Sequence, residues 1–191
     1  SEDKFHGMGR EDIDAAMLGE GRPFVLELRQ PKVRNLDLAA LEKVINAAAA
    51  GRITANGLAW VERPRVAELK ETVCDKTYRI DINFDQPVEI ERLKKGVQRL
   101  TGKVVEQRTP TRVSHRRADL VRSRRVESMK LLSAGATSAE LEIRAQHGTY
   151  IRELVSGDGG RTSPSLATLI GTECQVEVLD VLHIHLEDSK T

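Results

Sequence analysis

The segment Tyr78-Arg79-Ile80-Asp81-Ile82-Asn83-Phe84 alternates apolar and polar residues along its whole length. Successive side chains of a β-strand point to opposite faces, so the apolar residues would share one buried face and the polar residues would face water. This alternation is typical of an antiparallel sheet that is covered on one side only. The segment, extended back to residue 72, therefore predicts a strand of such a sheet.

The other segments predict more strands than helices and no strict alternation between the two. We expect strands over 23–29, 120–132, 138–145 and 175–185, a strand pair over 53–62 that turns at Asn56-Gly57, and helices over 38–50, 87–100, 149–155 and 165–170. An irregular segment over 107–117 and a glycine-rich loop over 157–164 join them. This order predicts an α+β fold, with a mixed, mostly antiparallel sheet flanked by helices.

The composition argues against several classes of protein. The chain has 191 residues, which suits one domain or one domain with an appendage, and it has no apolar run long enough to span a membrane. It shows no signal-peptide pattern, and Cys74 and Cys174 lack metal-type spacing, so we expect reduced thiols in a cytoplasmic protein. His183 and His185 would share a strand face, but two histidines without a third ligand do not predict a metal site.

Positive charge is concentrated in one part of the chain. Nine basic and three acidic residues lie between Lys103 and Lys130, whereas the whole chain has a net charge of only +1. Seven of the nine are arginines, whose planar guanidinium pairs with two phosphate oxygens at once. The segment therefore predicts a surface for a polyanion. The alternative is a solvated hairpin with ordinary surface charge.

Glycines enclose a cluster of charged residues near the start of the chain. The stretch Gly9-Arg10-Glu11-Asp12-Ile13-Asp14 is followed by Gly19-Glu20-Gly21-Arg22-Pro23-Phe24. Glycine permits tight turns and close approach of a ligand. The carboxylates and arginines crowded between these glycines can therefore hold one acid ionised in a fixed place. We identify Asp12 as a candidate nucleophile. Two alternatives stay open: Asp12 or Asp14 caps a helix, or Glu11, Asp12 and Asp14 bind Mg²⁺ as in a nuclease.

Two residues elsewhere are candidate companions of Asp12. Tyr78 can stack on a nucleic-acid base through its ring, or it can be an ordinary core residue of its strand. Arg152, at the start of a short helix, can pair with a buried carboxylate and keep it ionised, or it can pair with Glu153 at the surface. The loop over 157–164 can form a phosphate-binding nest, although it lacks the lysine and spacing of a P-loop.

Four blocks of sequence follow one another in a recognisable order. They are 9–24 with its Met17-Leu18-Gly19, then Lys76-Thr77-Tyr78, then Gln107-Arg108-Thr109-Pro110 with the basic residues up to 119, and finally Gly148-Thr149-Tyr150-Ile151-Arg152-Glu153 with Gly160-Arg161-Thr162 behind it. Together they resemble the archaeal and eukaryotic tRNA pseudouridine synthase family that acts at positions 54 and 55 of the T-arm. The resemblance covers nearly the whole chain from Phe5 onward.

The resemblance implies a fold, a reaction and a set of site residues. The fold would be the pseudouridine synthase fold, as one catalytic domain over 1–191 that lacks the N-terminal RNA-binding part of full-length members. Asp12 would be the nucleophile, Tyr78 would stack on the flipped uracil and take part in a later proton transfer, and Arg152 would pair with Asp12. Leu169 and Ile151 would form apolar walls under the base. Substrate contacts are expected from Arg10, Arg22, Arg108, Arg112, Arg116, Arg117 and Arg161.

The resemblance also implies what the protein works with. The substrate would be tRNA, and the chemistry would need no cofactor and no metal. No membrane and no obligate protein partner are expected. The chain departs from the family pattern at Ala16, where an arginine is usual, and at Met8, where a smaller residue is more common. A catalytically impaired tRNA-binding module of the same fold is therefore the alternative.

Overall fold

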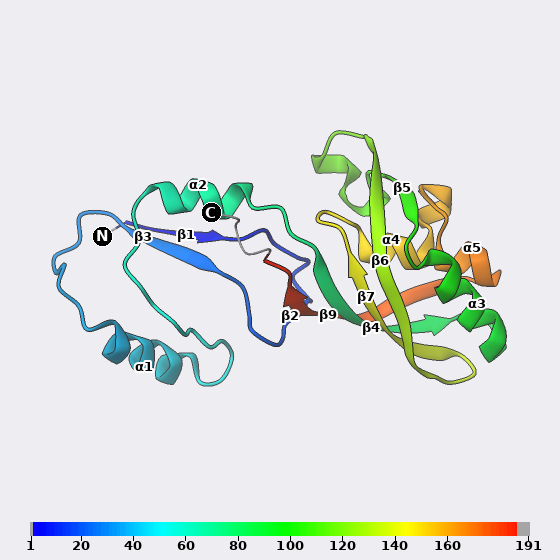
Figure 1. The fold of residues 1–191 in the computed structure, drawn as a ribbon, viewed down its shortest axis with the longest axis horizontal. Coiled ribbons are helices and arrows are strands. Elements are labelled where there is room, and N and C mark those ends of the chain that lie inside the picture. The colour runs from blue at the N-terminus through cyan, green and yellow to red at the C-terminus, as the bar shows by residue number, and fades with distance from the viewer. Residues whose placement is uncertain (1, 187–191) are drawn as a thin grey trace. The chain divides into compact units, whose positions relative to one another are not determined.

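The computed structural model describes residues 2–186, and the chain divides into two compact units. The first unit contains residues 1–10 and 23–72, and the second contains residues 11–22 and 73–191. The short segment 11–22, which carries Asp12, thus belongs to the second unit although its neighbours in sequence belong to the first (Figure 1).

The first unit is a two-stranded antiparallel sheet with two helices. Strand β1 (Asp3–Gly7) pairs with β3 (Phe24–Leu28), and the rings of Phe5 and Phe24 stack with centroids 5.3 Å apart. Helix α1 (Leu38–Ala49) begins where Asp37 accepts a hydrogen bond from the amide of Ala40, as expected for an N-cap. Helix α2 (Pro64–Glu71), which the sequence pattern did not predict, begins at a proline.

The predicted strand pair over 53–62 is wrong, because this segment contains no strand. The side-chain amide of Asn46 on α1 donates to the carbonyl of Ala55 at 2.8 Å and accepts from its N–H at 2.7 Å. Glu42, one turn earlier on α1, accepts from the amide of Leu58. Side chains of the helix therefore satisfy backbone groups that a partner strand would otherwise bind.

The second unit is built on a seven-stranded sheet, and it confirms the predicted α+β class. The strand order is β2-β9-β4-β7-β6-β5-β8, and every neighbouring pair is antiparallel except β2 with β9. The strands are β2 (Ala16–Met17), β4 (Lys76–Phe84), β5 (Val104–Arg108), β6 (Val121–Ala134), β7 (Ser138–Ala145), β8 (Thr162–Ser163) and β9 (Cys174–Ile184).

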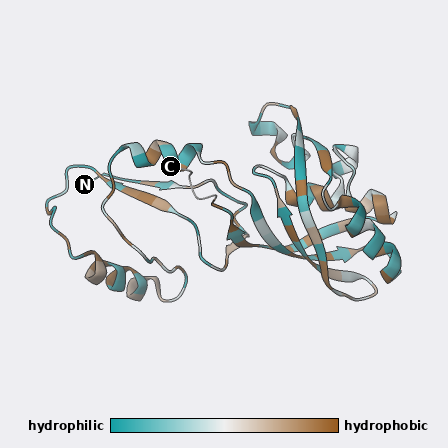
Figure 2. Ribbon diagram, viewed as in Figure 1, coloured by the Kyte–Doolittle hydropathy of each residue, from teal (hydrophilic) through white to brown (hydrophobic). Residues whose placement is uncertain are grey.

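Three helices cover one face of this sheet. Helix α3 (Ile90–Leu100) packs on β6, α4 (Ile151–Ser156) packs on β9, and both contact α5 (Leu166–Ile170) (Figure 1). The apolar residues of α5 and the apolar face of α3 form the core under the sheet (Figure 2). A Cβ at Gly96 would lie 2.8 Å from Ile170, so the close approach of α3 to α5 requires glycine there.

Strand β4 shows the predicted alternation, and this alternation positions the candidate site. Residues 76, 78, 80, 82 and 84 are buried on the covered face, and residues 79, 81 and 83 are exposed. Lys76 and Tyr78 therefore lie at the N-terminal end of β4, on the face that α4 also covers. Two 3₁₀ turns, η1 (Thr111–Arg116) and η2 (Asp158–Gly160), complete the unit.

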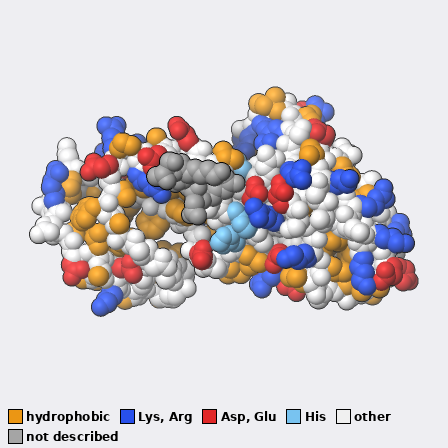
Figure 3. Space-filling model, viewed as in Figure 1, with side chains coloured by type: hydrophobic (Ala, Val, Ile, Leu, Met, Phe, Trp, Pro, Cys, Tyr) orange, Lys and Arg blue, Asp and Glu red, His pale blue; other side chains and the backbone are white. Residues whose placement is uncertain are grey.

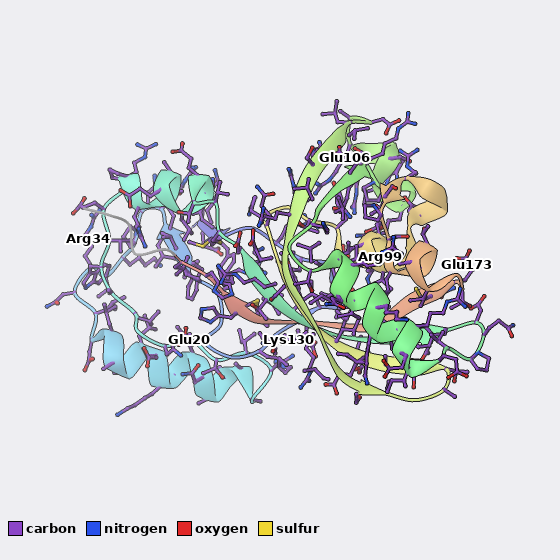
Figure 4. The ribbon with its side chains drawn as sticks, turned by 45° about the vertical axis from the view of Figure 1, so that its right-hand side comes forward. Glu20, Arg34, Arg99, Glu106, Lys130 and Glu173 are labelled. Carbon is purple, nitrogen blue, oxygen red and sulfur yellow. The ribbon has the colours of Figure 1, made fainter. Side chains whose placement is uncertain are left out.

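The side chains of this unit are drawn in Figure 4, which labels Arg99 on α3, Glu106 on β5 and Lys130 on β6.

Over residues 2–186, no helix is both long and apolar enough to cross a membrane. The same residues contain no group of three or more metal-binding side chains. The rings of His183 and His185 do lie together, with centroids 4.6 Å apart.

Candidate active site

Asp12 lies in a tight turn and caps no helix. The segment from residue 11 to residue 15 is irregular, and the amide of Ala15 donates to the carbonyl of Asp12 at 3.1 Å before β2 begins. Asp14 is two residues further along the same turn and is more exposed, with 58% of its side chain accessible against 35% for Asp12. The helix-capping alternative is therefore wrong for both residues.

Two arginines contact the two oxygens of the Asp12 carboxylate. Arg112 Nη1 donates to Oδ1 at 2.9 Å, and Arg152 Nε lies 3.8 Å from Oδ2. Arg152 also donates through Nη2 to Asp14 at 2.6 Å and through Nη1 to the carbonyl of Val176 at 2.6 Å. The guanidinium of Arg152 thus links the turn to strand β9, and it lies close enough to Asp12 for an ion pair.

Arg112 is itself held by a buried carboxylate. Its Nε donates to Glu153 Oε1 at 2.7 Å, and its Nη2 lies 3.5 Å from Oε2. The Glu153 side chain is only 6% exposed. Partial burial lowers the pKa of Arg112, but the hydrogen bonds to Glu153 and then to Asp12 raise it above its ordinary value. This guanidinium stays charged while it joins two carboxylates.

A buried glutamine fixes the start of α4 relative to β5. The side-chain amide of Gln107, at the end of β5, donates to the carbonyl of Tyr150 at 2.9 Å and accepts from its N–H at 2.8 Å. Tyr150 directly precedes α4, which carries Arg152 and Glu153. The amide of Thr111, at the start of η1, donates to Asp158 at 2.8 Å. The two elements that carry the site's cations are thus each held by polar contacts, α4 to β5 and η1 to η2.

Glu11 anchors the other side of the turn. Its carboxylate forms hydrogen bonds with both Lys76 and Arg22, and all three side chains are largely buried. Lys76 precedes Tyr78 by two residues on the same face of β4. Arg22, expected to bind substrate, is committed here to Glu11. A buried carboxylate between two cations fixes the backbone next to Asp12, because leaving either charge unpaired would be costly.

Tyr78 is buried beside this anchor. It pairs with Ile143 of β7 and Val181 of β9, and 7% of its surface is exposed. Burial raises the pKa of the Tyr78 phenol far above its ordinary value, and the nearby Glu11 carboxylate raises it further. The phenol is therefore neutral at physiological pH. Burial holds the ring rigidly but leaves little of it open, and the stacking role stays a prediction.

The remaining predicted residues fall into three groups. Ile151 is buried at the start of α4, while Leu169 is half-buried on α5 next to Gly96 of α3. Arg108 and Arg161 both bind Asp119, by contacts of 2.6 and 2.7 Å, and so close the base of the loop that contains η1. The other arginines of the prediction are exposed: Arg10, Arg116 and Arg117.

The basic segment is only partly available to a ligand. Arg116 and Arg117 lie at the end of η1, and Arg117 donates to the hydroxyl of Tyr150 at 3.2 Å. Basic side chains are spread over the visible face of the second unit with acidic ones among them (Figure 3). Several of the arginines predicted to bind phosphate, including Arg112 of η1, are thus paired within the protein, whereas Arg116 and Arg117 are exposed.

The site contains residues that the sequence reasoning did not assign. Lys76, Glu153 and Gln107 all lie inside the quoted blocks, but their partners are 41 to 65 residues away in the sequence. Lys76 was detectable as a charged residue in an otherwise apolar position of a strand. The Mg²⁺ alternative is weakened, because Glu11 and Asp12 each bind two cationic side chains and Asp14 binds one.

Comparison with known proteins places the chain in a family. The model of the family described as "Pus10, C-terminal" matches residues 1–185. A protein named tRNA pseudouridine synthase Pus10 from Methanothrix thermoacetophila is 49% identical over 180 residues, which cover 94% of this chain and 40% of that protein. Proteins of the same name from Halorubrum lacusprofundi and Archaeoglobus fulgidus are 45% and 46% identical, and the matches cover 98% and 95% of this chain.

The chain spans only part of these relatives, covering 44% of the Halorubrum protein and 50% of the Archaeoglobus protein. Among solved structures, a Cbf5-Nop10-Gar1 complex matches with a TM-score of 0.49 and 19% identity, over 58% of this chain and 30% of that one. A structure of an H/ACA RNP bound to a substrate RNA containing 2'-deoxyuridine matches with a TM-score of 0.46, 12% identity and coverage of 96% of this chain and 57% of that one.

Since the family model matches nearly the whole chain and the relatives cover it at close to half identity, the chain belongs to the Pus10 C-terminal family.

Proposed function

We propose that this chain is the catalytic part of a tRNA pseudouridine synthase that isomerises uridine at position 54, position 55 or both in the T-arm. The observation that carries the proposal is the Asp12 carboxylate, which lies in a fixed turn with a guanidinium on each oxygen. The names of the relatives support the reaction class. The expected tyrosine and the expected arginine lie in the same unit as Asp12.

The reaction matches the inventory of the site. Uridine isomerisation breaks the bond between the base nitrogen and the ribose, turns the base and rejoins it through carbon. No electrons and no external atoms are exchanged, so a nucleophile and a closed pocket suffice in principle. Asp12 would add covalently to the base or to the sugar carbon. Arg112 and Arg152 would keep its carboxylate ionised, because an adjacent positive charge favours the charged form of an acid.

The base must leave the RNA stack before it can react. An enzyme that flips a base needs a flat surface and apolar walls to receive it. Tyr78, with its neutral ring held by two neighbouring strands, would supply the surface, and Ile151 and Leu169 would supply walls. The exposed arginines of η1 would contact the phosphates around the flipped nucleotide, where they position the RNA without reading its sequence.

Mass mapping of pseudouridine in an unmodified tRNA transcript tests the proposal. The chain should convert uridine at position 54 or 55, and Asp12→Asn should abolish conversion. A chain that binds the tRNA but forms no pseudouridine would favour the impaired RNA-binding module, for which Ala16 is the sequence signal. Ala16→Arg would then be the informative variant, since recovery of conversion would identify position 16 as the cause. Failure to bind tRNA would overturn both versions.

A further inference from the structure

We propose that Arg112, held in place by the buried carboxylate of Glu153, is a positioning residue that fixes the Asp12 carboxylate for reaction. The inference rests on the proposed function, since it gives Asp12 the role of nucleophile. It adds a part to the site that the sequence reasoning did not foresee, because Arg112 was expected to bind RNA. The geometry carries it through three observations: the contacts of the guanidinium, the burial of Glu153 and the anchoring of η1.

The first observation is that all three guanidinium nitrogens of Arg112 have carboxylate partners. Nη1 donates to Asp12 at 2.9 Å, Nε donates to Glu153 at 2.7 Å, and Nη2 lies 3.5 Å from the second Glu153 oxygen. The edge of the guanidinium that faces Glu153 makes a two-point contact, which fixes the plane of the group. With that plane fixed, Nη1 can point in only one direction, and Asp12 lies there.

The second observation is that the side chain of Glu153 is buried, whereas that of Asp12 is partly exposed. The exposed fractions are 6% for Glu153 and 35% for Asp12. A buried carboxylate needs a cation and good hydrogen bonds, because the cost of removing its charge from water is otherwise not offset. Arg112 is that cation. Glu153 therefore holds Arg112 in place, and Asp12, in the more accessible position, accepts a hydrogen bond from Nη1 on the other side of the guanidinium.

The third observation is that the backbone at both ends of this contact is fixed. Thr111, the residue before Arg112, donates its amide to Asp158 at 2.8 Å. The segment before α4 is held by Gln107, whose side chain is fully buried. Residues of two separate elements, η1 and α4, thus meet at Asp12 in a defined geometry. Displacement of a reacting group by about 1 Å can lower a rate by roughly 100-fold, so such support has a catalytic effect.

The competing role of Arg112 is a contact to RNA phosphate, which could use only the guanidinium N–H groups that these bonds leave over. Arg116 lies on the same η1 turn, is exposed, and is available to phosphate without any rearrangement. The two roles predict different measurements. A phosphate contact changes affinity and the dependence of binding on salt. A positioning residue changes the rate of the bound complex and leaves the affinity nearly unchanged.

Single-turnover conversion of tRNA and RNA binding should be measured for Arg112→Ala, Arg112→Lys, Glu153→Gln and the double variant Arg112→Ala with Glu153→Gln. Arg99→Ala, which removes an exposed arginine of α3 (Figure 4), is the matched control for the loss of one positive charge. We expect Arg112→Ala to lower the single-turnover rate by about 100-fold with RNA affinity unchanged within about threefold. Guanidinium ion added to Arg112→Ala should restore part of the rate, and it should not help Asp12→Asn.

Glu153→Gln should cost less than Arg112→Ala, and the double variant should be no slower than Arg112→Ala alone, because Glu153 acts only through Arg112. Lysine supplies the positive charge but cannot make the two-point contact to Glu153. Arg112→Lys should therefore be folded but slow. Thermal unfolding of each variant identifies any that has lost its fold. If an Arg112 variant has lost its fold, the isosteric Glu153→Gln tests the inference in its place.

The outcomes separate the inference from the proposed function. If the unaltered chain forms no pseudouridine, the proposed function fails and the inference fails with it. If the unaltered chain is active and folded Arg112→Ala keeps its rate within about threefold of Arg99→Ala, the inference alone is overturned. A rate loss that follows weaker RNA binding, with a flatter salt dependence and no guanidinium rescue, would make Arg112 a phosphate contact and would likewise overturn it.

Discussion

Arg152 donates a 2.6 Å hydrogen bond to Asp14. Its distance to Asp12 is longer, with Nε 3.8 Å from Oδ2. The arginine that sequence reasoning assigned to Asp12 alone therefore serves both carboxylates of the turn. The closer contact orients the guanidinium through the more exposed carboxylate, and it leaves Oδ2 of Asp12 with a looser contact. If Asp12 is the nucleophile as proposed, Oδ2 is the less encumbered of its two oxygens for attack.

The first prediction separates the two carboxylates. Asp12→Asn should abolish pseudouridine formation, because the amide cannot act as a nucleophile, while tRNA binding should survive. Asp14→Asn should be milder, since it removes only the charge that orients Arg152. Mass mapping of the product and a filter-binding assay measure the two effects. An inactive Asp14→Asn beside an active Asp12→Asn would move the nucleophile by two residues.

The second prediction concerns the shape of Arg152. Lysine at this position would supply a single positive charge beside Asp12. The structure shows three directed contacts, to Asp12, Asp14 and the carbonyl of Val176. Lysine has a point charge and cannot reach all three in one plane. We therefore expect Arg152→Ala to be nearly inactive and Arg152→Lys to retain only a small part of the rate, as measured in single-turnover assays. Full activity of Arg152→Lys would show that charge alone matters.

Local pattern predicted the four long strands of the seven-stranded sheet, because burial on one face leaves a period of two in the sequence. The shorter strands β2, β5 and β8 were not predicted. Strand β4 lies where the alternation of 78–84 placed it. Strand β1 was missed, since Asp3-Lys4-Phe5-His6-Gly7 shows no such period; it is supported by β3 and by the stacking of Phe5 on Phe24. The false strand pair over 53–62 had a turn signal, but Asn46 takes up the backbone of Ala55. Contacts across the fold overrode local preference in both cases.

The candidate site was predictable to the extent that its motifs are local. Asp12 and its turn could be identified from the spacing of glycines and acids. The contact of Arg112 with Glu153 could not, because it joins two elements whose meeting depends on the whole sheet. The same holds for Arg108 and Arg161, which appear as free phosphate ligands in the sequence and are bound to Asp119 in the structure. Charge counts do not show which charges are already paired.

The third prediction tests which arginines bind RNA. Arg116→Ala and Arg117→Ala should each reduce the slope of log affinity against log salt by about one unit or less. A variant with one phosphate contact fewer releases one counterion fewer when it binds the RNA. Arg108→Ala should change the slope less, since Arg108 is held by a two-point contact to Asp119. Titration of tRNA binding over a range of salt concentrations measures this. An unchanged slope in the double variant of Arg116 and Arg117 would remove η1 from the interface.

The fourth prediction uses the burial of Tyr78. Burial, with a smaller contribution from Glu11, raises the pKa of its phenol far above its ordinary value of 10.0. Folding therefore favours the neutral phenol. The stability that this contributes is fully present below pH 10, where the phenol is neutral in both states. As the pH rises above this, the unfolded chain releases a proton that the folded chain retains, and the free energy of unfolding falls by at most about 1.4 kcal/mol per pH unit.

Tyr78→Phe keeps the ring and removes the titrating hydroxyl, so it isolates this effect. In urea unfolding from pH 7 to pH 11, the two proteins should differ by a constant amount up to about pH 9, and above pH 10 the original chain should lose stability relative to the variant. Cys174→Ala is a useful comparison, because burial raises the pKa of that thiol from 9.0 to about 12 and its effect should begin one unit lower. If the difference between the original chain and Tyr78→Phe stays constant through pH 11, then the phenol is hydrated in solution. Tyr78 would then be more accessible in solution than its 7% exposure in the structure indicates.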